Sequence, residues 1–352
     1  MLTGHRLFLL VTFAAVLIGS TMVQAQKRPI EKSQIDYNKL LQEQSAARRK
    51  QFESEMSKLQ AAAADLEAKL NRVPTKLDRK QAEAEFRKIL LEPDFAKQDQ
   101  QVEGFRARYA DQFAEQAGTA GIDPGGEGGR MASILGLPAD RVVPEAVRDN
   151  IRIRSVPPPE SEIGSTSSTA PLGPIEYRPA FTRQGIDGAP DNATADASTG
   201  FMWIHNMALF AGSSRTTAFL VQDAPINSGI THVRVDALLT NIDFITRANA
   251  ALAGYASSEV LVNLYVFDGP TRVASRTVSF DRAVAWTWGF SGRTDTVRRL
   301  NLSCEFDRAR PDEARTYTVM VEFEGWVAGA GIAGAAIDLR GHVRQINVTP
   351  RF

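Results

Sequence analysis

The C-terminal half of this sequence is dominated by apolar and polar residues that alternate with a period of two, most clearly between Arg315 and Val348. The apolar positions include Val319, Val321 and Phe323 in a first run and Ile337, Leu339 and Val343 in a second. This period is typical of strands that bury one face and expose the other. We therefore expect an antiparallel β domain in which Glu322 and Glu324 lie on the solvated face of a strand.

Further short runs of this kind occur between turn residues throughout 181–352. The predicted strands are 201–211, 215–222, 230–240, 258–268, 271–280, 297–306, 315–326 and 335–348. One segment, 241–257, interrupts the spacing, and we interpret it as a long connection with room for a helical turn. Strands at such short spacing, without helices between them, predict an antiparallel β-sandwich or jelly roll.

Two stretches of the predicted β domain have no polar face. In the strand 258–268, apolar residues occupy both faces, so this strand is either central and doubly covered or meets a second copy through residues such as Leu261. The segment Val327–Ile337 consists of small and apolar residues and predicts either an exposed apolar loop or a close-packed hairpin. We favour the hairpin.

Residues 26–117 have a helical composition, rich in Ala, Gln, Glu, Lys and Arg. Their clearest apolar seam has the spacing of a heptad repeat: Phe52, Met56, Leu59, Ala63, Leu66, Leu70 and Val73. Such a seam predicts either a coiled coil between copies of the chain, through residues 30–117, or a helical hairpin within one chain. The breaks at Pro74 and Pro93 favour the hairpin, whereas the regular seam favours self-association.

Residues 118–180 have the composition of a linker. Gly121–Gly129 is glycine-rich, and 156–174 is rich in Pro, Ser and Thr with almost no large apolar groups. Segments of this kind cannot bury enough surface to order themselves. The predicted fold class is therefore multidomain: an N-terminal helical segment that forms either a coiled coil or a hairpin, a spacer, and an all-β domain at 181–352.

Residues 1–25 have the layout of a secretory signal peptide. Its parts are the basic pair His5-Arg6, an apolar run over Leu7–Ile18, and a small-residue exit that ends at Ala25. We therefore expect an exported protein, located in the periplasm, at the cell surface or outside the cell. No second long apolar run follows, so no transmembrane helix is expected in the mature chain.

Composition and motifs exclude several kinds of function. The 41 basic and 41 acidic residues balance, which removes a general electrostatic case for nucleic-acid binding. A single cysteine, Cys304, allows no internal disulfide and lies in the pattern of a core strand. His205, His232 and His342 lie on polar strand faces without the spacing of a metal motif, so neither a metal nor a cofactor is predicted.

Tryptophans are candidates for ligand contact. Trp286 and Trp288 lie on one face of a short segment and offer a stacking platform for a sugar ring, although large aromatics more often close one end of a sandwich. Trp203 is assigned to the core. Trp326 is also expected to pack inward, but it adjoins the two glutamates and completes the candidate ligand-binding set.

Glu322 and Glu324 are the candidate carboxylate pair. Two strand steps separate them by about 6.5–7 Å, which is close to the carboxyl separation of inverting glycosidases. Such enzymes place their carboxyls on opposite sides of a sugar, and neighbours on one strand rarely achieve this. No catalytic residue is therefore assigned.

The leading hypothesis is an exported, non-enzymatic structural or adhesive protein of the cell envelope. A helical stalk would present a β-sandwich head that contacts a carbohydrate or a cell-surface protein, and oligomerisation would raise its avidity. One alternative is a carbohydrate-active enzyme that uses Glu322 or Glu324. Another is a purely structural assembly subunit joined through the outer face of 258–268.

Overall fold

The structure, a computed structural model, describes residues 37–92, 94–135, 176–184, 192–209, 212–251, 253–286 and 289–351. The chain divides into two compact units, Met1–Leu41 and Gln42–Phe352. Of the first unit only the beginning of one helix is described, and all contacts given below belong to the second. The predicted signal peptide, 1–25, and most of the predicted linker lie outside the described residues.

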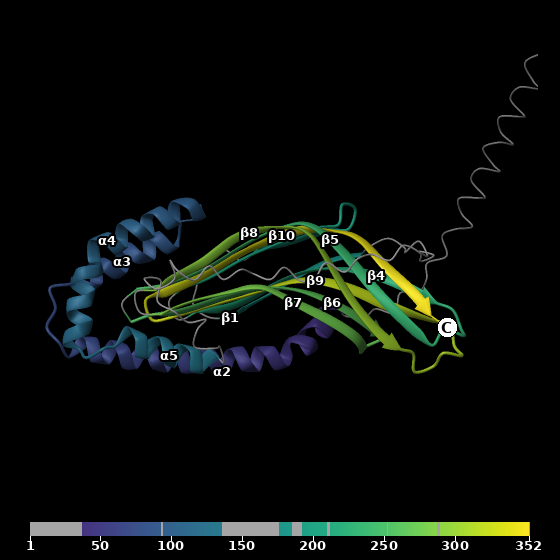
Figure 1. Ribbon diagram of the computed structural model, residues 1–352, viewed down its shortest axis with the longest axis horizontal. Coiled ribbons are helices and arrows are strands. Elements are labelled where there is room, and N and C mark those ends of the chain that lie inside the picture. Colours follow the sequence, from purple (N-terminus) through teal and green to yellow (C-terminus); the bar gives the residue numbers. More distant parts are fainter. Residues whose placement is uncertain are drawn as a thin grey trace, which may run out of the picture. The chain divides into compact units, whose positions relative to one another are not determined.

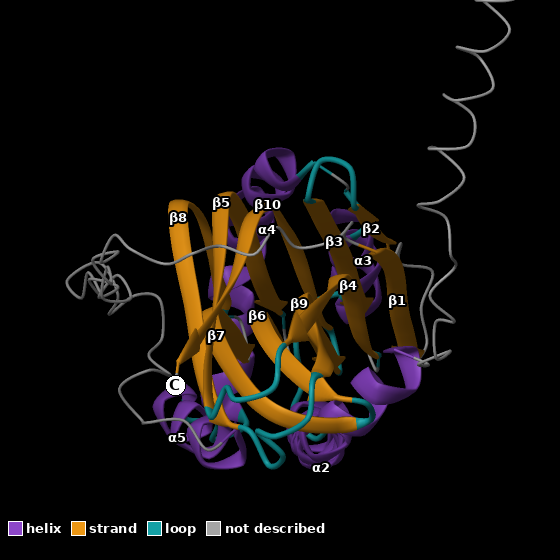
Figure 2. Ribbon diagram, turned by 90° about the vertical axis from the view of Figure 1, so that its right-hand side faces the viewer, coloured by secondary structure: helices purple, strands orange, loops and turns teal. Residues whose placement is uncertain are grey.

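The described strands form two five-stranded antiparallel sheets that face each other, which confirms the predicted β-sandwich (Figure 1, Figure 2). Sheet A contains, in spatial order, β1 (Glu176–Gln184), β4 (Ser213–Ile226), β9 (Arg315–Ala330), β6 (Tyr255–Asp268) and β7 (Thr271–Trp286). Sheet B contains β2 (Asn192–Asp196), β3 (Phe201–Leu209), β10 (Ala333–Arg351), β5 (His232–Ala250) and β8 (Phe290–Asp307).

The two sheets pack together through the apolar positions of the period-two pattern. These buried side chains include Val262, Leu264, Val321 and Phe323 on sheet A and Leu239, Phe244, Ile337 and Leu339 on sheet B. Cys304 belongs to this core, as predicted, and burial raises the pKa of its thiol to about 11. The core occupies the inner faces, so the outer face of each sheet is left to meet helices, solvent or ligands.

β5 corrects the prediction of a long connection at 241–257, because the strand continues through most of this segment. Its alternation is offset at Asn241, which has a positive φ of 52°, and the register with β10 shifts at the same place. Leu239 and Ile242 therefore both face the core although they are three positions apart. Because of this bulge, a strict period of two does not detect the second half of the strand.

The turn between β9 and β10 is the close-packed hairpin that the sequence favoured. Ala328, Ala330 and Ala333 are all buried beside it. Gly331 at the turn has a φ of 68°, and an added Cβ there would lie 1.9 Å from the carbonyl oxygen of Ala253. Only glycine combines this backbone conformation with so close an approach.

The described helices are α2 (Tyr37–Asn71), α3 (Arg79–Leu90), α4 (Phe95–Thr119) and α5 (Pro124–Leu135). The carboxylates of Asp78 and Asp94 accept backbone N–H groups at the starts of α3 and α4, as N-cap residues do. No described helix combines the length and hydrophobicity that a membrane span requires.

Helix α5 lies where the sequence predicted a flexible Gly121–Gly129, and that part of the linker prediction is wrong. Pro124 occupies the first helical position, where its fixed φ is favourable. Glu127, one turn on, is buried and accepts a 2.7 Å hydrogen bond from the hydroxyl of Tyr255 on sheet A. Contact with the sheet offsets the low helix propensity of the glycines.

The heptad seam of α2 is buried within this one chain. Met56 and Leu59 pack on the outer face of sheet A beside Trp286. Leu66 and Leu70 pack with α3, α4 and one end of sheet B. The helices therefore share apolar clusters with the sandwich, which corrects the prediction of a separate stalk. The hairpin alternative is favoured, and self-association stays a prediction.

Candidate functional site

Glu322 and Glu324 form the centre of an ionic cluster on the outer face of sheet A. Arg215 on β4 donates from Nε to Glu324 at 2.8 Å and from Nη2 to Glu322 at 2.9 Å. Asn263 on β6 donates to both carboxylates at 2.9 Å. Arg48 of α2 adds a 2.6 Å bond to Glu324. Three strands and one helix thus converge on two neighbouring carboxylates.

This cluster is sealed, which corrects the expected solvated strand face. Glu322 is 0% exposed, Glu324 1% and Arg215 5%. Burial, and then the charge of Glu324, raise the pKa of Glu322 to about 7. Burial also acts to raise the pKa of Glu324, but the guanidinium groups of Arg215 and Arg48 outweigh it and lower that pKa. The two carboxyls therefore differ in their affinity for a proton.

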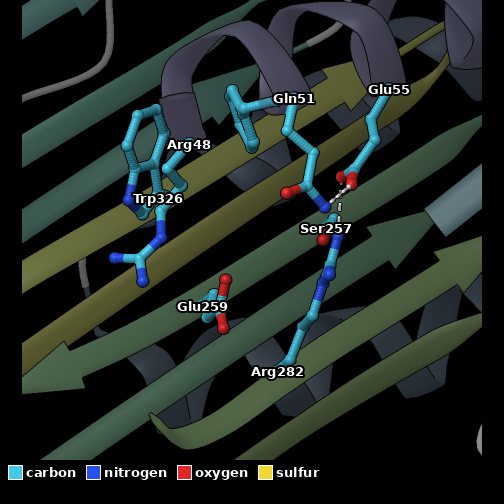
Figure 3. Close-up of a pocket in the computed structure, with 8 residues that line it drawn as sticks. Arg48, Gln51, Glu55, Ser257, Glu259, Arg282 and Trp326 are labelled. Atoms are coloured by element: carbon cyan, nitrogen blue, oxygen red, sulfur yellow. Dashed lines mark hydrogen bonds and ion pairs between the residues drawn. The ribbon is translucent and has the colours of Figure 1, made fainter. Parts of the chain in front are cut away.

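A cavity of about 190 Å³ lies next to this cluster, between α2 and sheet A (Figure 3). Its lining residues are Arg48, Gln51, Phe52, Glu55, Ser257, Glu259, Arg282 and Trp326. Arg48, Gln51 and Glu55 extend from α2 toward the sheet, and Glu55 pairs with Arg282 at 2.8 Å. Neither Glu322 nor Glu324 lines it, so this space offers no sugar access to the predicted pair.

The structure separates the tryptophans of the predicted set. Trp326 is buried, donates from Nε1 to Glu324 at 3.0 Å, and packs against Phe52 with ring centroids 4.8 Å apart. Trp286 is buried beneath α2 and is no exposed platform. Trp288 lies outside the described residues. The structure thus joins Trp326 to Glu324 beneath α2, while Trp286 packs in the apolar cluster of Met56 and Leu59.

A second and larger cavity, a groove of about 590 Å³, lies on the outer face of sheet B. It is lined by Phe95, Asn192, Trp203, His205, Asp243, Phe244, Ile245, Thr294, Asp295, Thr296, Asp338 and Arg340. Strand register explains why these side chains meet, since residues directly opposite on antiparallel strands point to the same face. One such row of directly opposite residues crosses β3, β10, β5 and β8. It pairs Trp203 with Arg340, Arg340 with Asp243, and Asp243 with Thr296.

Trp203 is the aromatic centre of the groove. It is half-buried, and its Nε1 donates to Asp338 at 2.9 Å, while His205 Nδ1 lies 3.4 Å from the same carboxylate. Phe95, the first residue of α4, brings a second ring, 6.0 Å from the ring of His205. These contacts hold the tryptophan ring in one orientation within an accessible groove.

Polar side chains along the groove alternate between donors and acceptors. Arg340 Nε donates to Asp243 at 3.1 Å, and the hydroxyl of Thr296 donates to the other oxygen of Asp243 at 2.7 Å. Asp295 pairs with Arg293. Apolar rings beside planar polar groups can contact both the C–H face and the hydroxyls of a sugar.

Sequence reasoning missed this groove. It assigned Trp203 to the core and treated His205 as part of an ordinary polar face. The available signal was an aromatic and a histidine at alternate positions of one strand, but their partners on β10, β5 and β2 depend on sheet order, which the sequence did not reveal. Among the described residues, no group of three or more His, Cys, Asp or Glu side chains is arranged to hold a metal ion.

No protein-family model matches this chain, and no curated protein matches it. Among solved structures, it is similar to TmCBM61 in complex with β-1,4-galactotriose, with 12% identity over 46% of this chain and 89% of that one and a TM-score of 0.16. A cyclase from Fischerella sp. is 8% identical to this chain, with 46% of this chain and 91% of that chain covered and a TM-score of 0.18.

The enzymatically active domain of tailspike protein 4 from bacteriophage CBA120 has 12% identity, with 42% of this chain and 19% of that chain covered and a TM-score of 0.15. Identities and TM-scores this low say nothing about what this chain binds.

Proposed function

We propose that this chain is an exported, non-catalytic carbohydrate-binding protein, and that the groove on sheet B is its binding site. The observation that carries the proposal is Trp203, a half-buried tryptophan held by Asp338 in a groove lined by further donors and acceptors. A ring fixed before binding loses little freedom when a ligand stacks on it. A structural or adhesive role in the cell envelope follows from such binding together with the predicted signal peptide.

A carbohydrate fits this groove better than a protein surface does. Its volume, about 590 Å³, is that of a small-ligand site, large enough for a few sugar rings. Its three carboxylates can accept hydrogen bonds from sugar hydroxyls, and its one guanidinium group, Arg340, can donate to them.

The enzyme alternative lacks support from the geometry. When one carboxyl acts as general acid and another as general base, the two need different pKa values and must both lie beside the substrate. Glu322 and Glu324 have that difference, but both are buried outside the two cavities. The assembly alternative also loses its surface, because Leu261 is already buried in the single chain.

The test compares Trp203→Ala with Trp326→Phe on an array of neutral and acidic glycans, followed by affinity electrophoresis with the retained polymers. We expect Trp203→Ala to weaken binding by about 2 kcal/mol, roughly thirtyfold. Trp326→Phe, which alters the sealed face only, should bind as the wild type does. Undiminished binding by Trp203→Ala, or no retained glycan for the wild type, would overturn the proposal.

A further inference from the structure

Beyond the groove, the outer face of sheet B becomes basic. Arg340 belongs to the groove, and the next row along the sheet pairs His342 with Thr240 and Thr240 with Arg299. Arg344 reaches the same row, because its Nε donates to the hydroxyl of Thr240 at 3.1 Å. The basic row is therefore continuous with the groove that contains Trp203.

Two strand irregularities expose these arginines: a break in the alternation of β8 and a register shift of β10. At the bulge of Asn241, β8 presents two consecutive exposed residues, Arg298 and Arg299, where a regular strand would turn one of them inward. The register of β10 against β5 shifts on either side of Val343, and Arg344 is exposed there. Bulges commonly redirect side chains next to functional sites.

The positive charge of this region is not neutralised within the described part of the chain. The two rows contain Arg340 and Arg299 and one carboxylate, Asp243, and the exposed Arg298 and Arg344 lie next to these rows in sequence. Asp243 already accepts from Arg340 and Thr296. The side chains of Arg298 and Arg299 form no hydrogen bond or ion pair with described residues. Unpaired guanidinium groups on one face attract an anionic ligand.

We infer that the groove takes an acidic polysaccharide, one whose sugar rings carry carboxylates. This inference rests on the proposed function and specifies its ligand. One ring stacks on Trp203 while the carboxylates of neighbouring rings lie along Arg299, Arg340 and Arg344. Guanidinium groups match the planar geometry of carboxylates and bind them through paired hydrogen bonds.

Nucleic acid is the other polyanion that aromatic and basic groups can bind. The groove itself disfavours it, since Asp243, Asp295 and Asp338 line the space that a phosphate backbone would enter. The same three carboxylates are acceptors for sugar hydroxyls. The combination of carboxylates in the groove with arginines beside it thus favours a ligand that has both hydroxyls and carboxylates.

The experiment measures affinity of the full chain for polygalacturonate and alginate, for the uncharged esters of both polymers, and for a single-stranded oligonucleotide. Esterification removes the charge and leaves the backbone of each polymer. We expect at least one acid form to bind about tenfold more tightly than its ester at low salt. High salt should reduce this preference by screening.

The double variant Arg299→Gln/Arg344→Gln should lose the preference for the acid form while still binding the ester. Arg272→Gln, an exposed arginine on β7 of sheet A, is the matched control and should retain it. Equal affinity for acid and ester, or binding of neither acid polymer while other glycans bind, would overturn the acidic ligand but leave carbohydrate binding intact. Tighter binding of the oligonucleotide than of any glycan would overturn both proposals.

Discussion

The outer faces of sheet A and sheet B carry the same kinds of side chain, yet one is sealed and the other is open. Each has a tryptophan whose Nε1 donates to a carboxylate, Trp326 to Glu324 and Trp203 to Asp338, and each has arginines on neighbouring strands. Glu324 is 1% exposed, whereas the side chain of Asp338 is 20% exposed. Helix α2 packs on sheet A, while α4 reaches the groove of sheet B with Phe95 at its start.

Burial decides which partners the same charged and polar side chains require. On sheet A, Glu322 and Glu324 are almost completely buried, so they must be satisfied by Arg215, Asn263 and the partly exposed Arg48. Every one of those bonds is internal, and the cluster serves to hold strands and helix together. On sheet B, the polar groups of the groove are partly exposed, so part of their hydrogen-bonding capacity faces solvent.

The largest expected effect comes from breaking the sealed cluster. Arg215→Met should lower the free energy of unfolding by about 3–5 kcal/mol, because it leaves two carboxylates buried with much of their compensation removed. Arg340→Met on the open face should cost less than about 1 kcal/mol, since its pair with Asp243 is exposed to water. Urea denaturation measures both.

Arg215→Lys should cause a smaller loss of stability than Arg215→Met, because lysine keeps the positive charge but cannot bond both carboxylates through a planar guanidinium group. Equal losses of stability for Arg215→Met and Arg340→Met would contradict the contrast between the faces. Any Arg215 variant that folds should still bind glycan at the groove as the wild type does.

The next effect concerns the helix that seals sheet A. Leu59→Ala should lower the free energy of unfolding by about 3 kcal/mol, because the side chain fills the contact between α2 and the sheet. Gln60→Ala, at an exposed neighbouring position, should change stability little. Light scattering should give the same mass for both variants and the wild type. A wild-type dimer or trimer that Leu59→Ala dissociates would instead support a coiled coil between copies.

Much of the fold was predictable because local periodicity records which face of each element is buried. Alternation located eight of the ten described strands but missed β1 and β2, the first of which begins inside the predicted linker. The heptad spacing correctly marked the buried side of α2. Where the rule failed, a local irregularity was the cause: the bulge at Asn241 displaced the alternation of β5. Pro124 began a helix that the neighbouring glycines had concealed.

The sites were much less predictable, because exposure depends on partners that are distant in sequence. Glu322 and Glu324 alternate with apolar residues in the same way whether water or a helix covers them. Arg48, which closes the cluster, lies 276 positions from Glu324. Trp203 has the pattern of a core residue, and only sheet order brings Arg340 and Asp243 beside it. Periodicity therefore identifies faces, but it does not identify what lies on them.

The smallest effect is a dependence of stability on pH that arises from the sealed face. Because the pKa of Glu322 is raised from 4.5 to about 7, the folded state keeps a proton that the unfolded state releases between these values. Its contribution to stability is complete below about pH 4.5 and falls as pH rises toward 7. Glu322→Gln removes this titration, so the stability of the variant relative to wild type should rise across that interval. Urea denaturation at each pH measures these stabilities. Glu43→Gln, at an exposed position on α2, is the control, and its stability should change with pH as that of the wild type does. If the stability of Glu322→Gln also follows the wild type, Glu322 is ionised throughout this interval.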